Sequence, residues 1–128
     1  MPATWVQHVT APLGADKAAP KDFRFGDLQL TDPVRQSVFE AGYTEPTPIQ
    51  AATVPILLAG KDCVGQAHTG TGKTAAFGLP IVERIDPKQR VVQAIVLVPT
   101  RELCRQVSAE IERLGKRSEE HTSELQSR

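Results

Sequence analysis

The 128-residue sequence lacks a long apolar run and an excess of either charge. No stretch approaches the ~20 apolar residues that a membrane-spanning helix needs, and the N-terminus has no basic region followed by an apolar one. Fifteen basic and fifteen acidic residues cancel, so the chain as a whole has no net attraction to nucleic acid or to a membrane surface. A nucleic acid must therefore be held by a local site, and no membrane partner is expected.

Aromatic residues and cysteines are also scarce. Aromatics make up 5% of the sequence, so the core must be built from Val, Ile, Leu and Ala, as is typical of parallel α/β proteins. The two cysteines, Cys63 and Cys104, are far apart and have no metal-ligand spacing. We expect two buried free thiols, a reducing compartment and a cytoplasmic location.

A glycine- and threonine-rich stretch occupies residues 65–74. Gly70 and Gly72 permit a tight turn that brings backbone N–H groups against phosphate oxygens. Lys73 can reach terminal phosphates, and the Thr74 hydroxyl can ligate Mg²⁺. A helix that begins near Gly72 points its positive end at the same anion. The stretch therefore predicts a site for a nucleoside triphosphate.

One position departs from the general phosphate-loop pattern, because Ala67 stands where that pattern has glycine. Alanine tolerates most turn geometries at negative φ, so the loop can still form. The alternative is a turn that merely joins two elements. The phosphate loop requires a preceding apolar strand and a following helix, and residues 63–64 and 75–77 suit both.

The elements around the loop predict an open parallel sheet. Residues 91–98 form a nearly continuous β-branched run, typical of a strand that is covered on both faces. With a strand at 63–67 and a helix from Lys73, this order predicts a right-handed βαβ crossover. Within that helix, Gly78 and Pro80 predict a break or a bend.

Two helices are predicted before the loop. Thr31 can cap a short one, which Gly42 ends in a left-handed conformation. Thr47 caps the second and Pro48 opens it, while Pro55 predicts that it divides into two short helices. Its core-facing stripe is predicted to be Ile49, Ala52, Ile56 and Leu57.

A last helix follows the 91–98 run. Thr100 is its predicted cap and Gly115 its predicted end. Arg101 lies in the first turn, where a cation opposes the helix dipole, so we expect an anion or a carboxylate beside it. The core-facing residues repeat every three or four positions and are Leu103, Val107, Ile111 and Leu114.

Four stretches, in this order and spacing, closely resemble the N-terminal motifs of DEAD-box ATP-dependent RNA helicases. They are Phe25, Gly42 to Gln50, Ala67 to Thr74, and Pro99 to Leu103. The resemblance covers about residues 23–116 and explains Ala67, because that family commonly carries alanine there. It implies a P-loop NTPase fold of the RecA-like type, a three-layer αβα parallel sheet that is incomplete in this chain.

The resemblance also implies a site for ATP and Mg²⁺. Gln50 would recognise adenine, since a side-chain amide can bond N6 and N7 together. Tyr43 would offer its face to the base, with Phe25 beside it or simply buried in the core. The predicted nucleotide-binding residues are Tyr43, Glu45, Thr47, Gln50, Ala67, His68, Thr69, Gly70, Thr71, Gly72, Lys73 and Thr74. Lys73 and Thr74 are the catalytic candidates, and Thr74 is the metal ligand.

In the family, the segment that matches Pro99 to Leu103 contacts the sugar–phosphate backbone of single-stranded RNA. A few contacts to the backbone can position a strand without a basic domain. The predicted RNA-binding residues are Pro99, Thr100, Arg101 and Glu102. The alternative is that Arg101 and Glu102 merely complete a helix start.

The family's Asp-Glu-Ala-Asp segment, which helps to hold Mg²⁺, does not occur in the sequence. We therefore expect the parent protein to be an ATPase and RNA helicase, and these residues to bind ATP without turnover. The predicted strands would lack their neighbours and expose apolar edges. A non-catalytic adenine-nucleotide or RNA-binding module and a non-functional truncated product remain as alternatives.

The two ends of the chain are expected to lie outside the domain. Residues 1–22, rich in Ala, Pro, Gly and Thr, predict a flexible extension before a monomeric domain at 23–116. Residues 117–128 break the helix stripe and resemble the translation of a sequencing-adapter oligonucleotide. We expect an artefactual tail there, with a genuine polar tail as the alternative.

Overall fold

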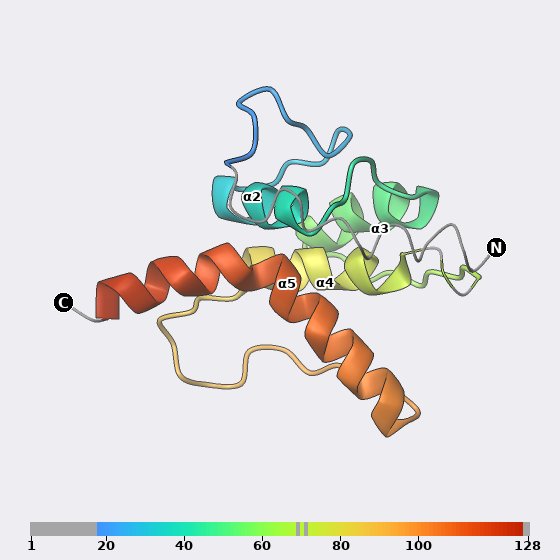
Figure 1. The fold of residues 1–128 in the computed structure, drawn as a ribbon. Coiled ribbons are helices and arrows are strands. Elements are labelled where there is room, and N and C mark those ends of the chain that lie inside the picture. The colour runs from blue at the N-terminus through green and yellow to red at the C-terminus, as the bar shows by residue number, and fades with distance from the viewer. Residues whose placement is uncertain (1–17, 69, 71, 127–128) are drawn as a thin grey trace.

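The computed structural model describes residues 18–68, 70 and 72–126, and this part of the chain folds into four helices (Figure 1). They are α2 (Asp32–Glu40), α3 (Pro48–Leu58), α4 (Lys73–Arg84) and α5 (Arg101–Gln126). Helix α4 packs between α3 and α5, and the later half of the bent α5 lies against α2. No helix among the described residues is long and apolar enough to cross a membrane.

The core lies where these helices meet. Its fully buried members come from the loop before α2 and from all four helices, and they are Phe25, Val34, Val38, Val54, Ala75, Leu79 and Leu114. The predicted stripe of the last helix is confirmed at Val107 and Leu114, which are buried, whereas Leu103 is 36% exposed. Aliphatic side chains therefore supply most of the core, as the composition predicts.

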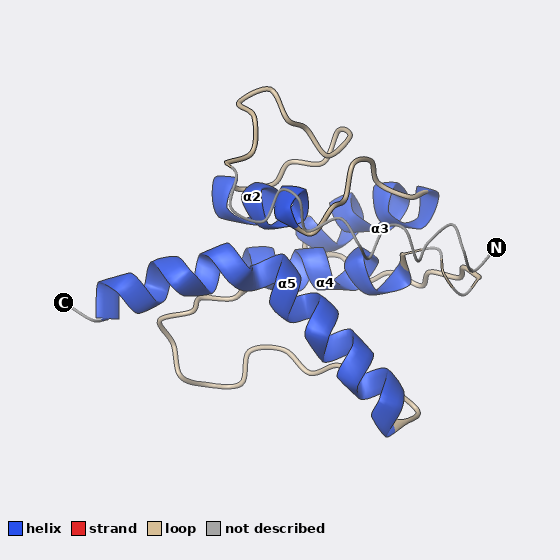
Figure 2. Cartoon of the chain, in the orientation of Figure 1, coloured by secondary structure: helices blue, strands red, loops and turns tan. Residues whose placement is uncertain are grey.

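Neither predicted strand forms in the described residues (Figure 2). Segments 63–67 and 91–98 lie outside the helices, and no backbone hydrogen bond joins either to another described segment. The prediction of two strands is wrong here because a strand exists only through hydrogen bonds to a neighbour. The predicted exposure of apolar edges is confirmed, since Val64 is 96% and Leu97 90% exposed.

Helices α3 and α4 are each continuous, so the predicted division of α3 at Pro55 and the predicted break of α4 at Gly78 and Pro80 are wrong. The alternative of a bend in α4 stays a prediction. Pro55 removes a hydrogen bond to Ala51, which is exposed, so the freed carbonyl can bond to water. Gly78 lies against α5, where an added Cβ would be 3.3 Å from a methyl of Leu114. Packing thus outweighs the cost of about 1 kcal/mol for glycine in a helix.

Helix α5 continues past Gly115, so the predicted end of this helix is wrong. A Cβ at Gly115 would lie 3.2 Å from Val82 Cγ1. This glycine therefore serves the close approach of α5 to α4.

The buried face of α3 also differs from the predicted apolar stripe. Gln50, Thr53 and Val54 are buried, while Ala52 and Ile56 are exposed. The polar pair can be buried because its hydrogen bonds are made; Thr53 Oγ1, for example, donates to the Ile49 carbonyl at 2.7 Å. Apolar spacing alone could not show this.

The predicted cap positions are largely confirmed. Gly42 has a φ of 87°, and Thr100 Oγ1 accepts from the Leu103 N–H at 3.1 Å. Thr31 precedes α2, but its hydroxyl donates to Glu83 Oε1 at 2.7 Å and makes no cap bond. It therefore joins α2 to α4.

Both cysteines are free thiols, as predicted, but their predicted burial is wrong. Cys63 is only half-buried and Cys104 is exposed. Cys63 lies in the unpaired segment before the phosphate loop, which has no neighbouring strand among the described residues to cover it fully.

Candidate nucleotide site and RNA-contact segment

Gln50 joins the start of α3 to the phosphate loop. Its Oε1 accepts from the Thr47 N–H and its Nε2 donates to the Gly72 carbonyl, each at 3.0 Å. Thr47 Oγ1 accepts from the Gln50 N–H at 3.4 Å, which completes a capping box. The two motifs that the sequence assigns to base and phosphates therefore meet in one place.

The Gln50 side chain is fully buried in this arrangement. Its amide still has one N–H and one oxygen lone pair unused by these bonds. Neither is accessible to a base from solvent, so a contact with adenine requires the side chain to turn outward. That movement breaks the bond to the Gly72 carbonyl.

Gly72 ends the loop with a φ of 82° and is the N-cap of α4. The backbone conformation favours glycine, and an added Cβ would strike Gln50 Nε2 and displace the amide from its bond to the Gly72 carbonyl. Gly70 has a φ of 84° and nothing within 4 Å of an added Cβ, which leaves open space beside the loop. Thr69 and Thr71 lie outside the described residues.

The N-terminus of α4 suits an anion. Among the described residues no side chain caps this end of the helix, so none of them uses its first N–H groups. Lys73 is exposed and Thr74 half-buried in the first turn, while Ala75 and Ala76 fix the helix in the core. A helix N-terminus, an exposed ammonium group and open space together fit a phosphate chain with its cation.

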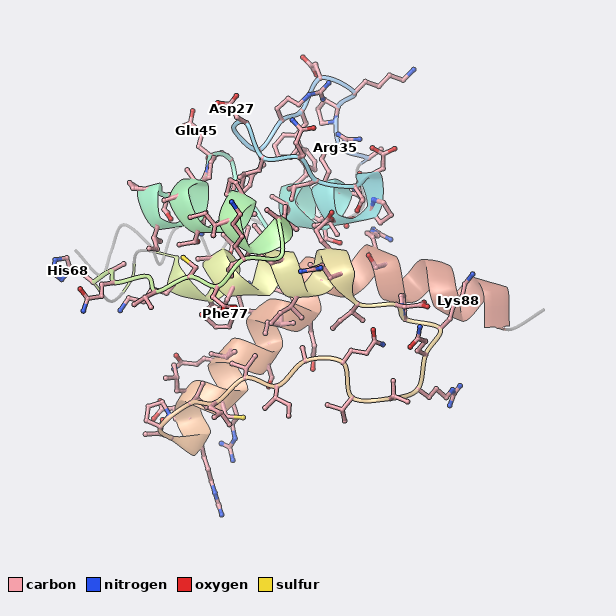
Figure 3. All side chains as sticks on the ribbon, turned by 180° about the vertical axis from the view of Figure 1, so that it is seen from behind. Asp27, Arg35, Glu45, His68, Phe77 and Lys88 are labelled. Atoms are coloured by element: carbon pink, nitrogen blue, oxygen red, sulfur yellow. The ribbon has the colours of Figure 1, made fainter. Side chains whose placement is uncertain are left out.

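The earlier part of the loop is less enclosed. Ala67 is half-buried, and His68 is exposed at the outer edge of the molecule (Figure 3). The loop thus presents His68 away from the helices and the following glycines toward α4.

On the base side, Tyr43 is half-buried and meets the edge of Phe25, with ring centroids 6.0 Å apart. Phe25 is only 1% exposed, which favours the core role over direct contact with a base. Glu45 is exposed beside this pair, at the top of Figure 3. Only Tyr43 offers aromatic surface here.

The predicted RNA-contact segment is open to solvent. Pro99, Thr100, Arg101 and Glu102 are all exposed. None of the ion pairs in the described part of the chain includes Arg101, so the carboxylate partner considered for it is not found. An anion from outside the chain remains as the expected partner.

The sequence model of the DEAD/DEAH box helicase family matches residues 47–127 of the chain. The chain belongs to the DEAD/DEAH box helicase family. It is 53% identical over 93 residues to the ATP-dependent RNA helicase CshA of Limosilactobacillus reuteri, a match that covers 73% of this chain and 19% of that protein. The CshA helicase of Bacillus subtilis (strain 168) is 52% identical over 91 residues, a match that covers 71% of this chain and 18% of that protein.

Solved structures confirm the predicted fold class of this DEAD/DEAH box helicase chain. A DEAD box protein from Methanococcus jannaschii gives a TM-score of 0.66 at 40% identity, over 70% of this chain and 24% of that one. Dbp5 of S. cerevisiae, bound to RNA and ADP BeF3, gives a TM-score of 0.68 at 34% identity, over 70% of this chain and 24% of that one. The chain therefore has part of a RecA-like fold and spans about a fifth of the length of its curated relatives, 19% in the first case.

One contact of this helicase chain was missed by the sequence analysis, because it uses a residue assigned to the tail. Arg117 Nε donates to Glu40 Oε2 at 2.6 Å, and its second guanidinium contact is to Glu40 Oε1. The Arg117 N–H donates to Ser37 Oγ at 3.1 Å. The Arg117 guanidinium lowers the pKa of Glu40 below its ordinary value. Residue 117 is therefore part of the packed structure, while the origin of the tail stays a prediction.

Proposed function

We propose that the chain is the N-terminal part of an ATP-dependent RNA helicase and binds ATP with Mg²⁺ and the backbone of RNA. The observation that carries this proposal is the 3.0 Å bond from Gln50 Nε2 to the Gly72 carbonyl. It joins the predicted adenine-recognition motif to the phosphate loop. Had the two motifs lain apart, no single nucleotide could have reached both.

The phosphate half of the site uses the start of α4. The uncapped N–H groups and the exposed Lys73 ammonium neutralise the phosphate charge, and the Thr74 hydroxyl would hold Mg²⁺. When bound, Mg²⁺ supplies charge neutralisation on the terminal phosphates. The chain's own contribution is to orient those phosphates.

The base half depends on Gln50 turning outward. Its amide can then donate to adenine N7 and accept from N6, whereas guanine presents an oxygen acceptor where adenine has N6. Tyr43, whose ring packs against Phe25, would then face the base. Nucleotide binding would thus exchange the Gly72 bond of Gln50 for bonds to the base.

RNA would lie across Pro99–Glu102, at the exposed start of α5. The first N–H groups of this helix and the guanidinium of Arg101 suit a phosphate oxygen. Such contacts are largely indifferent to base sequence. We propose binding without turnover, since the sequence contains no Asp-Glu-Ala-Asp segment.

Calorimetric titration of ATP and Mg²⁺ into the chain tests this function. We expect Lys73→Ala to weaken ATP binding by at least about tenfold, because it removes the ammonium group nearest the phosphates. Lys61→Ala is the matched control, since Lys61 is an exposed lysine of the loop before the site. Absence of ATP binding by the wild-type chain, or equal losses in the two variants, would reject the proposal.

A further inference from the structure

The turn at residues 23–28 lies directly on the chain that leads into the adenine-recognition motif. Gly26 has a φ of +59°, and a Cβ added there would be 2.6 Å from Pro46 Cγ and 2.9 Å from Pro46 Cδ. Real Cβ atoms do not approach other atoms so closely, and the proline ring has no flexible end that could move away. Gly26 is thus required both by its backbone conformation and by this contact.

Each partner in this contact adjoins a residue of the base site. Phe25 precedes Gly26 and packs its ring edge against Tyr43 at a centroid distance of 6.0 Å. The turn is closed by a 3.2 Å bond from the Leu28 N–H to the Phe25 carbonyl. Pro46 precedes Thr47, which caps α3 and binds Gln50.

Figure 3 shows the same juxtaposition. Asp27 and Glu45, the neighbours of Gly26 and Pro46, lie close to each other in the upper part of this view. Both side chains are exposed. The two segments therefore lie side by side, joined by the close approach of Gly26 to Pro46.

We propose that Gly26 is a positioning residue for the adenine pocket. It lets the 23–28 turn pack directly against Pro46, and this contact keeps Tyr43 and the capping box of Thr47 and Gln50 in the positions that the base requires. This inference rests on the proposed function of the site. A side chain at position 26 would push the turn away from Pro46, and the displacement would reach the base half of the site. The atoms near an added Cβ at Gly26 all belong to Pro46, and none belongs to the described residues of the phosphate half.

The chain offers a matched control in Gly60, which ends α3. Its φ is +81°, and the nearest atoms to an added Cβ are those of the Arg84 guanidinium, at 3.8 and 3.9 Å. Gly26→Ala and Gly60→Ala therefore share the strain of a left-handed alanine. They differ in the clash with Pro46.

The test measures the affinity of the 128-residue chain for ATP and for inorganic tripolyphosphate, each with Mg²⁺. We expect Gly26→Ala to weaken ATP binding by roughly tenfold, since small displacements of a binding group are costly. Tripolyphosphate binding should change by less than about twofold, because it reports the phosphate half alone. Gly60→Ala should leave both affinities within about twofold of the wild type.

A second substitution tests whether the clash with Pro46 is the cause. Pro46→Ala removes Cγ and Cδ, the two atoms that an alanine at position 26 would strike. The double variant Gly26→Ala, Pro46→Ala should therefore bind ATP as well as Pro46→Ala alone does, a coupling expected only between groups in contact. This rescue is not expected if the strain of a left-handed alanine causes the loss.

Three results would overturn the inference: wild-type ATP affinity in Gly26→Ala, equal loss of ATP and tripolyphosphate binding in that variant, or no rescue by Pro46→Ala. A wild-type chain that binds neither ligand overturns the proposed function and this inference with it. A wild-type chain that binds ATP, with Gly26→Ala unchanged, overturns only the role of Gly26.

Discussion

At the scale of single residues, Gln50 joins the start of α3 to the phosphate loop. It is a polar side chain with 0% exposure, and it can be buried because both ends of its amide are bonded. The same amide is the group proposed to recognise adenine. Its burial means that the ligand-free site is held closed by the bonds that the base would replace.

Gln50→Ala should lower the free energy of unfolding by about 2–4 kcal/mol, because it leaves the Gly72 carbonyl and the Thr47 N–H without partners and opens a cavity. Urea denaturation followed by circular dichroism measures this change. Gln29→Ala is the control, since Gln29 is exposed, and it should change stability by less than about 0.5 kcal/mol. Equal stabilities of the two variants would contradict the structural role of Gln50.

At the scale of elements, α5 is the helix that ties the fold together. It packs on α4 through Ile111 and Leu114, which lie beside Gly78, and reaches α2 through Arg117. The ion pair with Glu40 joins residues 77 positions apart in the sequence. The side chain of Glu40 is only 7% exposed, so this pair is more shielded from water than an ordinary surface pair.

Arg117→Gln should destabilise the chain by about 1–3 kcal/mol, because it removes the charged partner of a mostly buried carboxylate. Arg105→Gln is the control on the same helix, since Arg105 is exposed and belongs to none of the ion pairs in the described part of the chain. That substitution should cost less than about 0.5 kcal/mol. Thermal denaturation at neutral pH compares the two variants, and a larger loss in Arg105→Gln would contradict the role of the Arg117–Glu40 pair.

The same pair predicts a dependence of stability on pH. The pKa of Glu40 is lowered from 4.5 by the hydrogen bonds and charge of Arg117, so the folded state binds this proton less readily than the unfolded state. The stabilisation of the folded state by the Glu40–Arg117 pair is complete above the ordinary pKa of the carboxyl group. It is lost as the pH falls through the lowered pKa. Between pH 6 and 3, wild-type stability should therefore fall more steeply than that of Arg117→Gln. If the stabilities of the two proteins fall in parallel as the pH is lowered, the Glu40–Arg117 pair is not the source of this pH dependence.

At the scale of the whole molecule, the segment at 91–98 is an unpaired apolar run beside a helical core. Val92 is 81%, Ile95 78% and Leu97 90% exposed, and no backbone hydrogen bond holds this segment to the other described residues. An uncharged β-branched run with free N–H and C=O groups is a template for pairing with another chain. The RecA-like fold normally covers such a strand on both faces.

The chain should therefore self-associate through this run. Sedimentation velocity over a range of concentrations should show oligomers for the wild type, and Leu97→Lys should shift the distribution toward monomer, because a charge in the run opposes strand pairing. Gln29→Lys is the control, since it adds the same charge at an exposed position outside the run. A wild-type chain that stays monomeric at every concentration would contradict this expectation.

The local signals in the sequence were sufficient wherever a structure depends on near neighbours. The Thr47–Pro48 start of α3, the left-handed Gly42 and the Thr100 cap follow from side-chain chemistry within a few residues, and all three were predicted. The order of the motifs also identified the family. By contrast, Pro55 and Gly78 predicted helix breaks that do not occur, because the carbonyl freed by Pro55 belongs to an exposed residue and Gly78 packs against α5.

The sequence by itself determined the helix starts, the phosphate loop and the family, because these depend on residue types at fixed short spacings. Only the tertiary structure decided that Gln50 lies buried against Gly72 and that Arg117 reaches Glu40. It also decided that residues 91–98 remain unpaired among the described segments. Each of these depends on which distant group lies beside the residue, and the pattern of one segment does not specify the neighbour that it will meet.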